Sequence, residues 1–213
     1  MASPVALPLT APPTQRGWLA YAALAALAVA AAQALDAYAW AHWRRPTIYD
    51  GDLGRLLRLM GYLPTWLIVA AALWLTDRRS TFRGRRAALM LWAPTLGGAV
   101  AELGKMLVRR LRPDPELFVY AWRPYTEDFF STRGLGMPSS HTMVAFAAAA
   151  ALSRLMPRAW WLWLLLAAGC GVTRVLALGH FASDVVAGAL LGYLVGDLVS
   201  RLAPCRVDGA SVT

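Results

Sequence analysis

Long apolar stretches alternate with shorter polar ones along most of this 213-residue chain. A helix needs roughly 20 apolar residues to cross a hydrocarbon layer about 30 Å thick, and several of the stretches meet or approach that length. We therefore predict an all-α fold, a six-transmembrane-helix bundle in a polytopic membrane protein. The six predicted spans cover residues 18–40, 59–76, 87–106, 142–156, 159–178 and 185–202.

The spans form one predicted domain at residues 18–203, between an N-terminal tail (1–17) and a C-terminal tail (204–213). The N-terminal tail is rich in Pro and Ala and carries no charged side chain before Arg16. A cleaved signal peptide normally has a basic start, so we expect a disordered tail followed by a retained helix. An even number of spans places both tails on one side of the membrane.

Positive charge suggests the orientation and the partner. The formal net charge is +9, but the basic residues border the apolar stretches and do not form one stripe, which favours the lipid bilayer over nucleic acid as the partner. The densest cluster, Arg78 to Arg86, falls between the second and third spans. Short loops rich in Lys and Arg are typically cytoplasmic. We therefore predict a multi-pass protein of the cytoplasmic (inner) membrane.

Three polar segments stand out between the spans: Lys105–Pro113 (KMLVRRLRP), Pro138–His141 (PSSH) and Arg174–Asp184 (RVLALGHFASD). Together they contain cations, hydroxyls, imidazoles and a carboxylate. Phosphoryl transfer depends mainly on positioning and on fixed positive charge around the transferred group. This combination therefore suits phosphoryl transfer. The predicted orientation places the three segments at one membrane interface, facing the periplasm or the cell exterior.

The first segment carries two candidate phosphate ligands, Lys105 and Arg112. If the third span stays helical through Arg112, these residues lie seven positions apart on nearly the same helix face. Arg109 and Arg110 are assigned to the membrane interface. The alternative for the whole basic cluster is contact with lipid phosphates or with the negative end of the helix dipole.

The second segment precedes the fourth span. Ser139 and Ser140 fit the start of a helix, where they either cap the helix or help its free amides to bind an anion. His141 would lie at the mouth of the span, and ionisable groups near a membrane core are costly and often functional.

The third segment combines a planar guanidinium with an acid–imidazole pair. Arg174 can bind two phosphate oxygens at once. His180 and Asp184 are four residues apart, so we expect them on one helix face, with the carboxylate holding the imidazole tautomer. The alternative is a polar pair that only caps the sixth span.

Small residues predict where the helices pack. Gly188, Gly192 and Gly196 recur every four residues along the sixth span, so they share one helix face and permit close approach. Gly97 and Gly104 belong to a similar surface on the third span. We expect these two helices to pack against each other.

The joint pattern K-x6-RP, PSSH and R-x5-H-x3-D closely resembles the type 2 phosphatidic acid phosphatase superfamily, which also contains vanadium haloperoxidases. The resemblance covers Ala87 to Leu202. Two positions depart from the usual pattern, because Ser140 stands where Gly is usual and Thr173 stands where Ser is frequent. The GMPSSH sequence at Gly136–His141 resembles the dolichyl diphosphatase branch.

The resemblance implies a role for each matching residue. His180 would attack phosphorus and form a phosphohistidine, Asp184 would support it, and His141 would protonate the leaving oxygen and then activate water. The phosphoryl oxygens would be held by Lys105, Arg112, Ser139, Ser140 and Arg174. The resemblance implies no cofactor and no metal.

The function implied is hydrolysis of the terminal phosphate of a membrane lipid phosphate or diphosphate. Undecaprenyl diphosphate is the leading substrate, with phosphatidylglycerol phosphate, phosphatidate and lipid A phosphate as alternatives. Transfer of the phosphate to another lipid would use the same residues. A nonenzymatic membrane binder and a haloperoxidase are weaker alternatives.

The polar connection before the fourth span is rich in aromatic residues between Leu117 and Phe130. Aromatic side chains favour the membrane interface. We hypothesise that this segment forms part of the entrance for a lipid substrate, with a simple packed lid as the alternative.

Overall fold

The computed structural model describes residues 15–77 and 84–202, and the predicted tails and most of the Arg78–Arg86 cluster lie outside these ranges. The described chain is helical, with two isolated β-bridges in the connection before α5. The α-helices are α1 (Gln15–His42), α2 (Asp52–Leu59), α3 (Leu63–Thr76), α4 (Arg85–Val108), α5 (Ser140–Leu155), α6 (Trp160–Leu176) and α7 (Ala182–Leu202).

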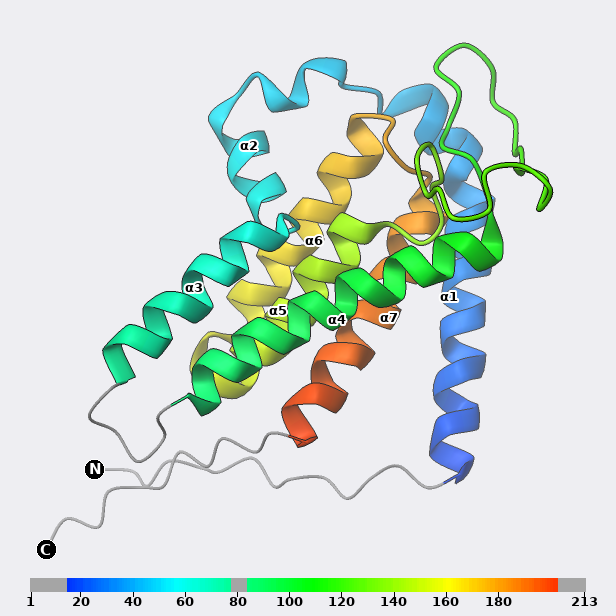
Figure 1. Cartoon of the computed structure of the whole chain (residues 1–213). Helices are drawn as coiled ribbons and strands as arrows, with labels where there is room; N and C mark the ends of the chain where they lie inside the picture. Colours follow the sequence, from blue (N-terminus) through cyan, green and yellow to red (C-terminus); the bar gives the residue numbers. More distant parts are fainter. Residues whose placement is uncertain (1–14, 78–83, 203–213) are drawn as a thin grey trace, which may run out of the picture.

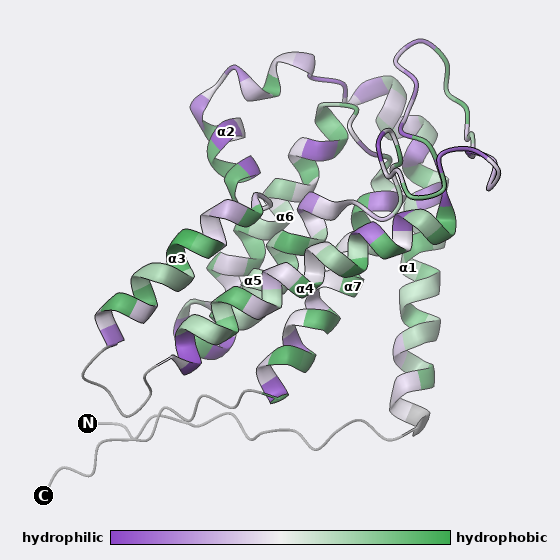
Figure 2. Cartoon of the chain, in the orientation of Figure 1, coloured by the Kyte–Doolittle hydropathy of each residue, from purple (hydrophilic) through white to green (hydrophobic). Residues whose placement is uncertain are grey.

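The long helices run between two ends of the bundle (Figure 1). One end holds α2, the connection from α4 to α5 and the turn from α6 to α7. The other end holds the start of α1 and the end of α7. Hydrophobic residues dominate the helix shafts, while hydrophilic residues gather in the connections and at the helix ends (Figure 2). This distribution is typical of a polytopic membrane protein.

Within the described ranges, four helices are long and apolar enough to cross a membrane: α1, α4, α6 and α7. A fifth crossing is possible if α2 and α3, which are bent by 65° across a short break, form one span. The predicted second span at 59–76 starts earlier than α3 does, and its bounds in the membrane stay a prediction. The chain breaks after Leu59, and α3 begins at Leu63 with Pro64 in its first turn, where proline is tolerated.

Helix α5 has 16 residues, so it is about 24 Å long. Ten of its residues are buried, six of them alanines, and the others are partly buried. It packs against α4, α6 and α7, so protein surrounds it and a match to the lipid thickness is less important. The count of six spans stays a prediction.

Helices α4 and α7 contact each other, as expected, but their glycine faces pack mainly on α5. A Cβ atom at Gly192 would lie 2.5 Å from the Met143 carbonyl oxygen, and one at Gly97 would lie 2.8 Å from the Ala147 side chain. The alanine-rich surface of α5 lets both neighbours approach closely. This packing brings the ends of α4, α5 and α7 together.

Candidate active site

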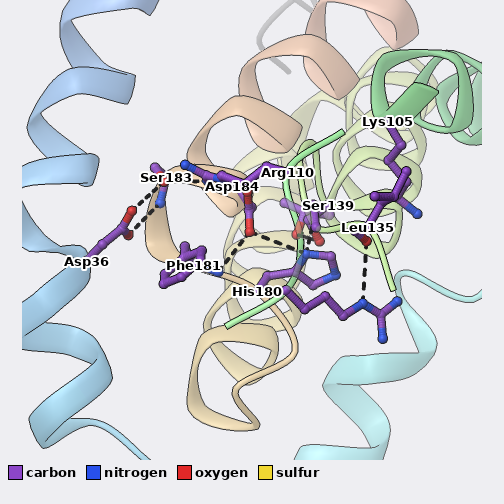
Figure 3. Close-up of polar contacts among 12 residues, drawn as sticks. Asp36, Lys105, Arg110, Leu135, Ser139, His180, Phe181, Ser183 and Asp184 are labelled. Atoms are coloured by element: carbon purple, nitrogen blue, oxygen red, sulfur yellow. Dashed lines mark hydrogen bonds and ion pairs between the residues drawn. The ribbon is translucent and has the colours of Figure 1, made fainter. Parts of the chain in front are cut away.

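The candidate active site lies at the end of the bundle where the three polar segments meet (Figure 3). His180 lies in the turn between α6 and α7 and is only 2% exposed. Its Nδ1 atom is 2.9 Å from the carbonyl oxygen of Gly136. Because a carbonyl only accepts hydrogen bonds, Nδ1 carries the proton and Nε2 keeps a free lone pair. This is the tautomer that a nucleophilic Nε2 requires.

Asp184 is fully buried in the first turn of α7, and its Oδ2 atom is 3.7 Å from His180 Nδ1. The same oxygen accepts a hydrogen bond from the backbone amide of Phe181. Two details of the expectation were wrong. His180 precedes α7, so the pair does not share a helix face, and Gly136, not Asp184, accepts the tautomer-fixing hydrogen bond. The carboxylate acts on the imidazole through its charge.

Burial lowers the pKa of His180, and the positive charges of Arg174 and Arg112 act in the same direction. Asp184 opposes this effect because its carboxylate favours the imidazolium form. The balance keeps His180 neutral near pH 7.

Arg174 is buried near the end of α6, under the turn that leads to His180. Its Nη1 atom donates to the hydroxyl of Tyr49 over 3.1 Å, and its side chain packs against Gly179. Within the described ranges its Nε atom is buried and has no hydrogen-bond partner. Buried donors are nearly always paired in folded proteins. The Nε of Arg174 is therefore a donor still able to bind an acceptor.

Lys105 and Ser140 converge on one carboxylate, that of Glu102. Lys105 Nζ is 2.8 Å from Glu102 Oε1, and Ser140 Oγ is 2.6 Å from the same oxygen. These two predicted phosphate ligands therefore come together, since their hydrogen-bond donors point to a shared acceptor.

Arg112 does not share a helix face with Lys105, contrary to the expectation. Helix α4 ends at Val108 because Arg109 adopts a left-handed conformation with a φ of 57°. The chain then continues without helix, and Arg112 is exposed and donates weakly to the Leu135 carbonyl over 3.4 Å. Its charge still interacts with those of Arg174, Glu102 and Asp184, so it belongs to the same electropositive cluster.

The start of α5 supplies the remaining predicted residues. Ser139 is buried at the N-cap position without a side-chain cap, and its amide donates to the Asp184 carbonyl oxygen over 3.1 Å. His141 is half-buried in the first turn. The charges of Arg174, Arg58 and Lys105 act on its ring. Both imidazoles thus lie at the same end of the bundle.

The assignment of Arg109 and Arg110 to the membrane interface was wrong. Both are buried, with exposed fractions of 1% and 3%. Arg109 donates to the carbonyl groups of Arg123, Pro124, Glu127 and Phe129, and so holds the connection before α5 in its fold. Arg110 forms an ion pair with Asp184 and a 2.7 Å hydrogen bond to Ser183 Oγ. Motif spacing alone could not show which arginine pairs with the carboxylate.

The sequence analysis also missed Tyr49 and Glu102, which contact predicted residues, and Asp36, which contacts Ser183 next to Asp184. Asp36 and Glu102 interrupt apolar stretches, and an acid at such a position is a functional signal in itself. Tyr49 follows the first span and carried no comparable signal. Among the residues that the structure describes, no group of three or more His, Cys, Asp or Glu side chains could hold a metal ion.

These features define a class of protein: a polytopic helical membrane protein with buried histidines and clustered cations at one end. The family model described as "PAP2 superfamily" matches residues 86–207, more than half of the chain. The chain belongs to the PAP2 superfamily.

Two similar proteins support this placement. The chain is 39% identical over 67 residues to the bacitracin transport permease protein BcrC of Bacillus licheniformis, which is 32% of this chain and 33% of that protein. The match thus spans about a third of the relative. The fold is similar to the crystal structure of a transmembrane PAP2 type phosphatidylglycerolphosphate phosphatase from Bacillus subtilis. The TM-score is 0.59 at 22% identity, over 87% of this chain and 92% of that one.

Proposed function

We propose that this protein is an integral membrane lipid phosphatase that removes the terminal phosphate of a lipid phosphate or diphosphate. The observation that carries the proposal is the buried, unpaired Nε of Arg174, next to the turn that holds His180. A phosphoryl oxygen bound there would complete the hydrogen bonding of the guanidinium. Lys105 and Arg112 would add two further fixed charges around the same group.

In the first chemical step, Nε2 of His180 would attack phosphorus. A bond forms between Nε2 and phosphorus, the bond to the leaving oxygen breaks, and that oxygen takes a proton from His141. Asp184 stabilises the positive charge that develops on the His180 ring. The product is a phosphohistidine together with the dephosphorylated lipid group.

In the second step, neutral His141 would take a proton from a water molecule, whose oxygen attacks phosphorus. The bond from phosphorus to Nε2 breaks, inorganic phosphate leaves, and His180 returns to its starting tautomer with Nδ1 bonded to Gly136. The phosphate is held by the same cations in both steps, since the loose transition state gains most from positioning.

The leading substrate is a polyprenyl diphosphate such as undecaprenyl diphosphate. Arg58 supports this choice, because its positive charge acts on His141, the residue proposed to protonate the leaving group. Arg58 is exposed on α2, its guanidinium stacks on the Tyr49 ring at 4.8 Å, and its charge acts on His141. A diphosphate has a charged leaving phosphate there, whereas phosphatidate or phosphatidylglycerol phosphate leaves an alcohol.

A lipid substrate also fits the exposed aromatic side chains of the connection before α5. Trp122, Tyr125, Phe129 and Phe130 are at least half exposed, which suits contact with the lipid interface. We expect the active site to face the periplasm or cell exterior. Replacing Trp122 and Phe129 with Ala should lower the turnover of a lipid phosphate but not that of a soluble phosphate ester. If the substitutions leave the turnover of the lipid phosphate unchanged relative to that of the soluble ester, the entrance role is disproved.

The main test is phosphate release by the purified protein from a panel of lipid phosphates and diphosphates, with and without a chelator. We expect chelator-resistant release that is fastest with the polyprenyl diphosphate, and loss of release in His180→Ala. Activity that survives in His180→Ala would reject the nucleophile, and loss with chelator would indicate a metal-dependent reaction. Transfer of the phosphate to an added second lipid, with no release of free phosphate in its absence, would identify a phosphotransferase.

A further inference from the structure

Asp36 is a buried acid on α1 that has no role in the mechanism above. Its side chain is 1% exposed, and it lies where α1 meets the start of α7 (Figure 3). Oδ1 accepts a hydrogen bond from the backbone amide of Ser183 over 3.0 Å, and Oδ2 accepts from the Ser183 hydroxyl and, over 3.1 Å, from the hydroxyl of Tyr120. The carboxylate therefore binds three donors that come from two other segments.

The hydroxyl of Ser183 connects Asp36 to the candidate catalytic pair. Arg110 Nη2 is 2.7 Å from Ser183 Oγ, and the same guanidinium contacts Asp184 Oδ1 through Nη2 and through Nε at 3.1 Å. Arginine only donates, so Ser183 Oγ accepts from Arg110 and gives its own hydrogen to Asp36. The direction of every hydrogen bond from Asp36 through Ser183 and Arg110 to Asp184 is thereby fixed.

This arrangement is expensive as a means of attaching α1. Asp36 and Asp184 place two negative charges around the single positive charge of Arg110, all of them buried. Burying charges costs several kcal/mol for each ion before pairing, and apolar residues would hold two membrane helices together without that cost. The arrangement is better explained by its effect on the geometry of Asp184.

The aromatic neighbours restrict the same group further. The Arg110 guanidinium lies 5.4 Å from the Tyr120 ring and 5.2 Å from the Phe181 ring. Burial and the nearby Asp36 raise the pKa of Tyr120 to about 12, so its hydroxyl stays protonated and keeps donating. Phe181 directly follows His180, so these contacts also border the nucleophile.

We propose that Asp36 is a positioning residue for the reaction: through Ser183 and Arg110 it sets the orientation of Asp184, and so the charge and geometry that His180 experiences. The inference rests on the proposed phosphatase function. It adds α1 to the catalytic machinery, although α1 lies outside the matched family region at residues 86–207.

The test compares Asp36→Asn with Tyr21→Phe, using phosphate release from a lipid diphosphate by the purified full-length protein. In Asp36→Asn an NH2 group replaces one carboxylate oxygen and faces a hydrogen-bond donor. The hydrogen bonds that connect residue 36 through Ser183 to Arg110 therefore weaken. We expect kcat to fall roughly 10- to 100-fold while KM changes less than about twofold. Tyr21→Phe removes another hydrogen bond between α1 and α7, to the Leu190 carbonyl far from the site, and should leave kcat unchanged.

The variant Ser183→Ala provides a second measurement. If Asp36 acts through Ser183, adding Asp36→Asn to Ser183→Ala should lower kcat by much less than it does in the wild type, since coupled residues are not additive. Unchanged kcat in Asp36→Asn, an equal loss in Tyr21→Phe, or full additivity with Ser183→Ala would each overturn the inference. A wild-type protein that releases no phosphate would instead reject the proposed function.

Discussion

Helix α7 carries two aspartates, each paired with arginine, at opposite ends of the bundle. At the candidate site, Asp184 has no exposed surface and its partner Arg110 is 3% exposed. Near the other end, Asp197 is 17% exposed and accepts from Arg154 and Arg201, at 2.6 Å each, with side-chain exposures of 35% and 29%. Both groups pair an aspartate with arginine, and they differ in burial and in their other partners.

That difference separates a functional ion pair from a structural one. An exposed pair between Asp and Arg contributes about 1 kcal/mol or less to stability. A buried pair gains little over well-packed apolar residues, because desolvation offsets the attraction, yet removing one partner is strongly destabilising. The Asp184 pair is therefore explained by what it does for His180, and the Asp197 pairs by their position at the ends of α5 and α7.

The largest expected effect comes from Asp184→Asn. The substitution keeps the shape of the side chain but removes the charge that supports a positively charged His180 ring. We expect kcat to fall by roughly 10⁴-fold, measured as phosphate release from a lipid diphosphate. The equivalent change Asp197→Asn is the matched control and should leave kcat within about twofold of the wild type.

Either of two results would contradict this comparison: a comparable loss of kcat in both variants, or an active Asp184→Asn protein. Because Asp184→Asn also leaves Arg110 buried without its charged partner, we expect a loss of about 3 to 5 kcal/mol in stability. Activity must therefore be measured on the folded fraction, with helix content followed by circular dichroism.

The next largest effect is expected for Arg174→Lys. Lysine keeps the charge but loses the planar fork and the Nε donor that is unpaired in the described protein. We expect kcat/KM to fall by roughly 100-fold, whereas Arg154→Lys at the other end should change kcat/KM less than about twofold. A fully active Arg174→Lys protein would show that charge alone, without the fork, holds the phosphate.

The sequence predicted the helical shafts well because apolar length is a direct physical signal. Residues 18–40 lie within α1 and 87–106 lie within α4. It failed where short-range geometry decides the structure, as at the left-handed Arg109 that ends α4 before Arg112. No hydrophobic pattern encodes such a turn.

The site was predictable only at the level of its motifs. Their spacing brought Lys105, His141 and His180 to one end of the bundle, but it did not show that Arg110 pairs with Asp184. That pairing joins residues 74 positions apart, so it depends on how α4 and α7 are held by α5. Asp36 was missed for the same reason, since its partner Ser183 is 147 positions away.

A smaller, graded effect is expected from pH. His180 must be neutral to attack, and burial lowers its pKa below the ordinary value of about 6.5. A lowered pKa extends the neutral form to more acidic solutions, so kcat/KM should begin to fall only below about pH 6.5, and then about tenfold per pH unit. Asp197→Asn should leave this profile unchanged. If kcat/KM already begins to fall above pH 6.5 as the solution is acidified, the surroundings stabilise the imidazolium form of His180 and raise its pKa.

The smallest effect is expected at the exposed end itself. Asp197→Asn removes both of its arginine contacts, yet solvent already screens these charges, so we expect a loss of about 1 kcal/mol or less in the free energy of unfolding. The loss should shrink further at high salt, because the screening length for exposed charges falls from about 10 Å at 0.1 M to about 3 Å at 1 M. Thermal unfolding in detergent at low and high salt measures both quantities. A loss of several kcal/mol that salt does not reduce would show that the Asp197 group is effectively buried in the membrane. The two ends of α7 would then differ in the partners of their aspartates and not in their exposure to water.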